Sequence, residues 1–169
     1  MALHGRFYLN KADWAPLDFY GLGRFPAFSG MKSFRNQPGC TYLRDDGAIP
    51  PGRYWIVDRP VGGYRTRFRE GLASFFGANI RRDWFALYRD DGTIDDYTFI
   101  DGVRRGNFRL HPMGPDRISK GCLTMQRSTD FTMLRNALLR TAPVMIPGTE
   151  LTAFGLVEVI GYEEFCPTL

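Results

Sequence analysis

The sequence predicts a mainly β protein with one packed α-helix, built as an antiparallel or mixed β-sheet domain. Three observations carry this prediction. Nineteen glycines and eleven prolines are spread along the 169 residues, a distribution typical of many tight turns. Short runs of β-branched and aromatic residues lie between them. Helical spacing of apolar residues occurs in one stretch, near residues 128–139. No repeat or linker divides the chain, so we expect one domain over residues 1–169.

The first half of the chain predicts strands joined by turns. The first forty residues contain "FYGLGRFPAFSG", in which glycines among aromatic residues predict short strands with tight turns. "GAIPPGRYWIVDRP" predicts a Pro-Pro-Gly turn and then a strand at about Tyr54–Asp58. Two β-rich runs, Trp84–Tyr88 and Ile94–Ile100, flank Asp91-Gly92. That dipeptide favours a hairpin between the two runs.

The second half adds the helix and the closing strands. "NFRLHP" predicts a short strand that ends at His111, because Pro112 cannot continue a ladder. A helix is expected to start near Ser128, where Ser-Thr-Asp supplies good N-cap types. Its buried face is expected to consist of the apolar residues at helical spacing, Phe131, Leu134, Leu138 and Leu139. "PGTELTAFGLVEVIGY" predicts two short closing strands.

The stretch from Gly62 to Arg82, "GGYRTRFREGLASFFGANIRR", departs from this pattern because it is both basic and aromatic. It is either a flap inserted over a site or a solvated connection with a short amphipathic helix. The sequence leaves both interpretations open.

Charge and hydropathy bear on partners and location. A net charge of +4 and a pI near 9.1 permit an acidic partner such as cell wall. The basic residues are dispersed among acidic ones, which argues against a nucleic-acid binder. No run of eighteen apolar residues predicts a membrane span. "MALHGRFYLNKADW" lacks an apolar core and a cleavage site, so we expect a chain made in the cytoplasm without a signal peptide.

Three cysteines and two histidines match no zinc pattern, and we expect no metal and no cofactor. If Cys122 takes part in chemistry, Cys40 and Cys166 remain as the pair that could bridge. A reducing cytosol favours two separate buried thiols instead. The sequence does not decide between them.

His111 and Cys122 are separated by eleven positions and could form a base and a nucleophile. Gly121 allows a sharp turn before Cys122, and Cys122 opens the apolar run "CLTM". Nearby cations, Arg109, Arg117 and Lys120, favour the thiolate over the thiol. The alternative is a buried structural cysteine beside an ordinary hydrogen-bonded histidine.

"RGNFRLHPMGPDRISKGCLTM" resembles the histidine, loop and Ser-x-Gly-Cys signature of the L,D-transpeptidases, the YkuD-type peptidoglycan enzymes. With "FPAFSG", "GAIPPGRYWIVDR", "DWFALYRDDGTIDD" and "PGTELTAFG", the chain is similar to the L,D-transpeptidase effectors of type VI secretion. The likeness covers roughly residues 19–160. Lys120 stands where the mainstream enzymes have a second histidine, and Thr124 where they commonly have arginine. These departures leave the acceptor substrate open.

The resemblance implies a domain of L,D-transpeptidase type with Cys122 as nucleophile and His111 as base. Ser119 and Gly121 would shape the pocket, with the Gly121 and Cys122 amides as oxyanion donors. The thiolate would attack the third residue of a peptidoglycan stem tetrapeptide and expel the terminal D-alanine. Water would then make the protein an L,D-carboxypeptidase, and an amine an L,D-transpeptidase. The candidates for binding stem carboxylates are Arg105, Arg109 and Lys120.

The resemblance also implies an antibacterial toxin delivered by a secretion apparatus into the periplasm of a target cell. Its expected partners are peptidoglycan stem peptides and a cognate immunity protein that occludes the active site. Two rivals remain. One is an NlpC-type amidase or endopeptidase, in which Cys40 would precede His111. The other is a non-catalytic wall-binding β domain.

Overall fold

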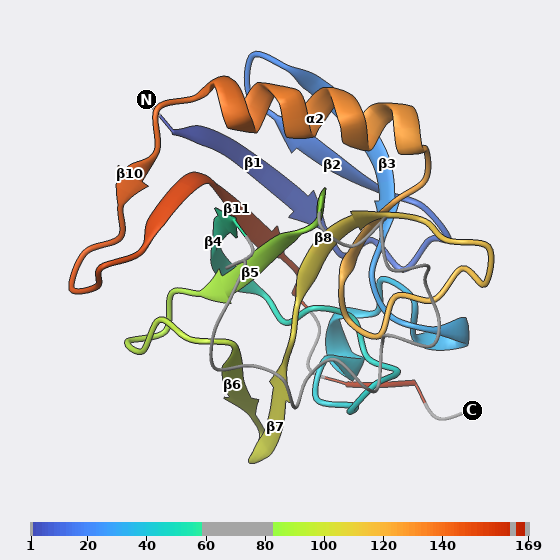
Figure 1. Cartoon of the computed structure of the whole chain (residues 1–169). Helices are drawn as coiled ribbons and strands as arrows, with labels where there is room; N and C mark the ends of the chain where they lie inside the picture. The colour runs from blue at the N-terminus through green and yellow to red at the C-terminus, as the bar shows by residue number, and fades with distance from the viewer. Residues whose placement is uncertain (1, 59–82, 163–164, 168–169) are drawn as a thin grey trace.

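The computed structural model describes residues 2–58, 83–162 and 165–167. The stretch expected to form a flap or a solvated connection, residues 62–82, lies outside the described residues. The described elements, drawn in Figure 1, are β1 (Leu3–Tyr8), β2 (Ala15–Phe19), β3 (Gly23–Phe28), the 3-10 turns η1 (Lys32–Phe34) and η2 (Pro38–Cys40), β4 (Gly52–Asp58), β5 (Phe85–Arg89), β6 (Tyr97–Ile100), β7 (Val103–Gly106), β8 (Arg109–Pro112), β9 (Leu123–Met125), α2 (Ser128–Arg140), β10 (Val144–Met145) and β11 (Thr152–Ile160).

Within the described residues, nine strands form one sheet in the order β1-β2-β3-β9-β8-β5-β4-β11-β10. A further pairing of β1 with β11 closes this sheet into a ring. The β1–β11 and β8–β9 pairs are parallel and the others are antiparallel. The prediction of a mainly β fold with one packed helix is therefore confirmed, and the sheet is of the mixed type.

Alternating burial explains why the ring has a core. On β2 every second residue is buried, because successive side chains of a strand point to opposite faces. The core contains large apolar side chains from several strands, among them Phe7, Leu17, Tyr54, Ile56, Leu110 and Leu123. No helix in the described part of the chain is long and apolar enough to cross a membrane.

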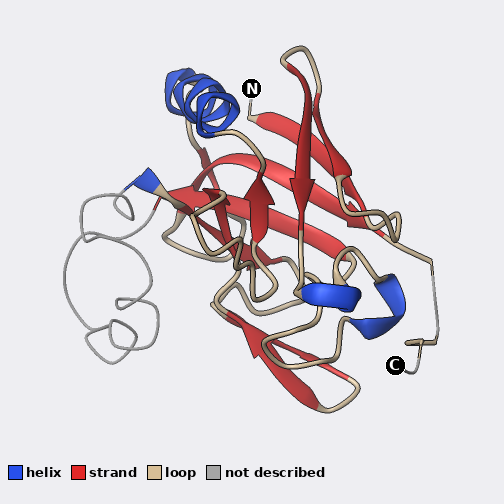
Figure 2. Cartoon of the chain, turned by 90° about the vertical axis from the view of Figure 1, so that its right-hand side faces the viewer, coloured by secondary structure: helices blue, strands red, loops and turns tan. Residues whose placement is uncertain are grey.

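Helix α2 covers one end of the ring, and the β6–β7 hairpin protrudes from the opposite end (Figures 1 and 2). The helix buries Phe131, Leu134 and Leu138, which lie on one face, and it contacts β8, β9 and β11. Leu139 was expected on this face but is 39% exposed, because it lies one residue beyond the buried stripe.

The predicted hairpin between β5 and β6 is wrong. Strand β5 pairs with β4 and β8, so both of its edges are occupied. Asp91 lies in a loop, where its carboxylate accepts a hydrogen bond from Thr98 at 2.6 Å. Strand β6 instead pairs with β7 across Asp101-Gly102, whose φ angles are +49° and +75°. Two Asp-Gly pairs occur in this region, and the second one makes the hairpin.

The two short closing strands are also replaced by a different arrangement. A single nine-residue strand, β11, follows the two-residue strand β10. Strand β11 continues through Gly155. A glycine is needed at this position because the backbone of β1 comes close. A Cβ at this position would lie 2.6 Å from the Leu3 carbonyl oxygen.

A disulfide joins Cys40 to Cys166 across 126 positions of sequence. Of the two alternatives that the sequence left open, the structure therefore has the bridge and not two separate thiols. The end of β11 returns the chain to η2, where Gly161 packs on Pro38 and Gly39 packs on the Phe165 backbone. This return brings the two cysteines together, which their spacing in the sequence could not indicate.

Candidate active site

The parallel pairing of β8 with β9 brings His111 and Cys122 to one face of the sheet. Leu110 lies opposite Leu123, and His111 lies opposite Thr124. Cys122 directly precedes β9, two positions before Thr124, and so continues the face that carries His111 and Thr124. The opposite face, with Leu110 and Leu123, enters the core. The predicted base therefore lies on β8, and the predicted nucleophile lies at the start of the strand that pairs with it.

A tight turn from Ser119 to Cys122 presents the thiol. The Cys122 amide donates to the Ser119 carbonyl at 2.9 Å. The two central residues, Lys120 and Gly121, have φ angles of +49° and +87°, as in a type I′ turn. The Ser119 hydroxyl donates to the Cys122 carbonyl at 2.7 Å and accepts from the Gly30 amide at 3.1 Å. Ser119 thus fixes the turn against the segment after β3.

This turn bears on the expected oxyanion donors. The Cys122 amide is engaged by the Ser119 carbonyl, so it is not directed at a ligand. Among the hydrogen bonds between described residues, none uses the Gly121 amide. Of the two expected donors, the Gly121 amide is the one left for a developing oxyanion.

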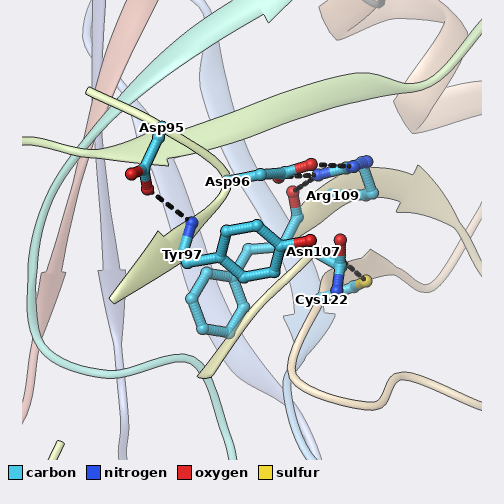
Figure 3. A network of polar contacts seen from close by, with 7 residues as sticks. Asp95, Asp96, Tyr97, Asn107, Arg109 and Cys122 are labelled. Atoms are coloured by element: carbon cyan, nitrogen blue, oxygen red, sulfur yellow. Dashed lines mark hydrogen bonds and ion pairs between the residues drawn. The ribbon is translucent and has the colours of Figure 1, made fainter. Parts of the chain in front are cut away.

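The Cys122 sulfur is held by the backbone that leads into β8. The thiol donates to the Asn107 carbonyl with a sulfur–oxygen distance of 3.7 Å, as Figure 3 shows. The Arg109 amide donates to the sulfur from the same segment. Burial raises the pKa of the Cys122 thiol to about 11, although the nearby cations Arg109 and Arg105 oppose this shift. In this state Cys122 is a neutral thiol.

The His111 ring is fixed on both edges and on one face. Its Nδ1 lies 2.8 Å from the Pro112 carbonyl oxygen, and its Nε2 lies 3.3 Å from the Thr124 hydroxyl. A carbonyl only accepts, so Nδ1 carries the proton and Nε2 is the basic nitrogen. Trp84 stacks on the ring with centroids 4.2 Å apart. Burial lowers the pKa of His111 to about 4, so the ring is neutral at pH 7 and can accept a proton.

Arg109, a candidate for binding stem carboxylates, faces a protein carboxylate in this structure. Its two terminal nitrogens donate to the two carboxylate oxygens of Asp96, at 2.7 and 2.8 Å (Figure 3). Arg109 also donates to the Phe108 carbonyl. A substrate carboxylate would therefore meet a guanidinium that already has a partner of that kind.

The other two candidates differ strongly in exposure. Arg105 is 4% exposed, and its guanidinium donates to the carbonyls of Thr41, Gly47 and Ala48. Lys120 is exposed at the surface of the turn, one residue before Gly121. No observation here tests a substrate contact for any of the three, so these roles remain predictions.

The thiol and the imidazole are nearly closed off from solvent. Cys122 is 3% exposed and His111 is 2% exposed. A substrate carbonyl can reach the sulfur only if neighbouring side chains move. Two surface hollows lie elsewhere, one between β1 and β11 and the other at the β2–β3 hairpin. Neither is lined by the predicted catalytic pair.

Four residues of the site were missed from the sequence: Trp84, Asp96, Asn107 and Thr124. Thr124 was noted as a departure from the family pattern, but not as a neighbour of the imidazole. The others gave no local signal, because their contacts join segments far apart in the chain. Among the described residues, no group of three or more His, Cys, Asp or Glu side chains could hold a metal ion.

Cys40 cannot act as the nucleophile of an NlpC-type peptidase in this structure. Its sulfur is bonded to Cys166, and the residue is fully buried. Cys122 is the one free thiol among the three cysteines of the chain, all of which are described.

Comparison with known proteins gives one match. The family model described as "Tlde1 domain" matches residues 23–149, which include every residue of the site discussed above. No curated protein matches the chain.

Proposed function

The chain belongs to the Tlde1 domain family of type VI secretion effectors, and from this premise we propose that it is a cysteine enzyme that attacks peptidoglycan. The proposed reaction is that of an L,D-carboxypeptidase and L,D-transpeptidase on stem tetrapeptides. The observation that carries it is that Cys122 directly precedes β9, the strand that pairs with the His111 strand β8, with the basic Nε2 set by the Pro112 carbonyl.

The proposed chemistry begins with transfer of the Cys122 thiol proton to His111 Nε2. The sulfur then attacks the carbonyl carbon of the third stem residue, and the carbonyl oxygen becomes an oxyanion. We assign the Gly121 amide as a donor to this oxyanion. Collapse breaks the peptide bond, and D-alanine leaves with the proton held by His111. A thioester remains on Cys122.

Resolution of the thioester decides the product. Water, deprotonated by His111, attacks the thioester carbonyl, releases the tripeptide stem and returns the proton to sulfur. A D-amino acid or the amine of a neighbouring stem attacks in the same way and forms a new amide bond. The burial of Cys122 supports a site in which access controls this choice.

Purified protein with disaccharide tetrapeptide muropeptides, with and without D-methionine, tests the reaction by mass spectrometry. We expect loss of one alanine, or its exchange for methionine, and no reaction with Cys122→Ala. Arg140→Ala is the control, because Arg140 is exposed in the last turn of α2 and has no assigned role in the site.

Cleavage elsewhere in the stem would contradict the proposal and indicate an amidase or endopeptidase. An unchanged set of muropeptides would favour the wall-binding domain instead. In that case Cys122→Ala would also retain whatever effect the protein has on cells.

We further propose that the protein is toxic in the periplasm of a target cell and that its producer makes an immunity protein that blocks access to Cys122. Family membership supports both statements. Periplasmic expression should arrest growth with the wild-type protein and not with Cys122→Ala. A neighbouring gene product should bind the protein and restore growth, and failure of every such product would contradict the immunity proposal.

A further inference from the structure

Arg105 is a buried cation whose hydrogen bonds, within the described part of the chain, go to neutral backbone carbonyls. Its Nη2 donates to the Gly47 carbonyl at 2.9 Å, and its Nη1 donates to the Thr41 carbonyl and to the Ala48 carbonyl. None of the ion pairs between described residues includes Arg105. A buried charge without a countercharge is costly, so hydrogen bonds to carbonyls must compensate its loss of water.

The guanidinium lies directly against the turn that presents the thiol. A Cβ at Gly121 would lie 2.6 Å from Arg105 Nη2 and 3.2 Å from the Phe108 ring. The Arg105 guanidinium carbon is 5.6 Å from the centre of the same ring. The same Cβ at Gly121 would lie 3.3 Å from the Gly47 carbonyl oxygen, so the turn, Arg105 and the loop at residues 41–48 all meet at this point.

The two arginines near Cys122 differ in whether a carboxylate pairs with them. The charged groups that act on the Cys122 sulfur are Arg109, Asp96 and Arg105. Arg109 is neutralised by Asp96, whereas Arg105 has only carbonyl partners among the described residues. Burial lowers the pKa of Arg105, and the exposed carboxylate of Asp45 opposes this shift but makes no ion pair with Arg105 among the described residues. A negative charge close to Arg105 at the site would form when the thiol ionises or an oxyanion develops.

We propose that Arg105 is a positioning residue of the proposed reaction, which holds the Ser119–Cys122 turn on the loop at residues 41–48 and places an unneutralised positive charge beneath the nucleophile. The inference rests on the proposed function for its reaction. Arg105 then acts through the turn and does not bind a stem carboxylate.

The Cys40–Cys166 disulfide supports the same arrangement. Cys40 immediately precedes Thr41, the first residue whose carbonyl Arg105 binds. At Gly47, a Cβ would collide with the Cys40 carbonyl and would lie 3.0 Å from Arg105 Nη1. The disulfide therefore anchors the start of the loop on which Arg105 holds the turn.

The test compares Arg105→Met, Arg105→Lys and the matched control Arg104→Met, whose wild-type side chain is exposed and stacks on Tyr97. Two readouts are needed. One is kcat and KM on the tetrapeptide. The other is the pH dependence of Cys122 alkylation by iodoacetamide, which reports the thiol pKa because Cys122 is the one free thiol.

For Arg105→Met we expect the alkylation midpoint to rise by about one pH unit, as loss of a nearby cation implies. We also expect kcat to fall about tenfold or more while KM stays within about twofold. Arg105→Lys should keep the midpoint, because it keeps the charge, but not the full kcat, because one ammonium cannot replace the guanidinium fork. Arg104→Met should match the wild type.

A folded Arg105→Met with an unchanged midpoint and kcat would overturn the proposal. A raised KM with unchanged kcat would also overturn it, in favour of stem binding. If Arg105→Met does not fold, Arg105→Lys decides, and a fully active Lys variant would count against the proposal. If the wild type is inactive on every muropeptide, the proposed function fails, and the alkylation midpoints still decide the role of Arg105.

Discussion

Burial holds His111 and Cys122 in their uncharged forms, and this should be measurable in the stability of the protein. The folded pKa of His111 is about 4, below the ordinary value of 6.5. The unfolded chain therefore binds the proton more tightly between these values. The contribution of neutral His111 to the free energy of unfolding is therefore complete above pH 6.5 and is lost as the pH falls towards 4.

Denaturant unfolding of wild type and His111→Gln at pH 7 and pH 4 tests this. We expect the free energy of unfolding to fall by about 3 kcal/mol more in the wild type than in the variant, as a shift of about 2.5 pKa units implies. Carboxylates also titrate in this range, and the variant subtracts their contribution. Equal losses in both proteins would contradict the assignment of a buried neutral imidazole.

Asp96 should control the reactivity of the thiol through Arg109. Its carboxylate pairs with Arg109, and its own charge raises the pKa of Cys122. Asp96→Asn should therefore leave the Arg109 charge less opposed, lower the thiol pKa and speed iodoacetamide alkylation at pH 8 by about threefold to tenfold. Asp95→Asn is the matched control, because Asp95 is the sequence neighbour that accepts from the Tyr97 amide (Figure 3). Equal alkylation rates in the two variants would argue against electrostatic control by Asp96.

At the scale of the elements, the turn before β9 requires a glycine both for its backbone conformation and for the space that a side chain would fill. Comparison with Gly148 separates these two reasons. Gly121 has φ +87°, and a Cβ would lie 2.6 Å from Arg105 Nη2. Gly148, in the loop between β10 and β11, has φ +75°, and a Cβ there would meet nothing within 4 Å. The two positions share the backbone conformation and differ in the space around it.

We expect Gly148→Ala to destabilise the protein by about 1 kcal/mol through backbone strain alone. Gly121→Ala should cost about 2–4 kcal/mol and reduce activity, because the added methyl group must also displace the guanidinium. Thermal unfolding and muropeptide assays measure both effects. Similar losses at the two positions would contradict close packing of Arg105 on the turn.

At the scale of the whole molecule, the disulfide ties the end of the chain to the loop that supports the site. It closes a segment of 126 positions, so the chain-entropy model predicts a stabilisation of about 5 kcal/mol. The double variant Cys40→Ser with Cys166→Ser should lower the melting temperature, and reductant should lower that of the wild type but not of the variant. A melting temperature equal to that of the oxidised wild type would show that the bridge adds no stability.

Much of the secondary structure could be predicted because its signals are local. Short strands in the first forty residues, a strand near Tyr54–Asp58, a strand that contains His111 and the helix α2 all follow from local composition and periodicity. The predicted end at His111 is wrong by one residue, because Pro112 still pairs with Met125. The pairing of β5 and β6 could not be predicted, because Asp91-Gly92 is a local signal whereas the partners of β5 come from β4 and β8. The single long strand β11 could not be predicted for a related reason, since the place of Gly155 within it depends on the approach of β1.

The sequence by itself determined the pair of groups that carry the proposed chemistry and the turn that presents one of them. His111, Ser119, Gly121 and Cys122 lie in one short segment, and a glycine between a polar residue and a strand is a local feature. The tertiary structure decided the bridge between Cys40 and Cys166, the pairing of Arg109 with Asp96, the burial of Arg105 and the placing of Trp84 and Thr124 on the imidazole. Each of these contacts joins segments that meet only when the sheet closes, and no periodicity within one segment encodes such a meeting.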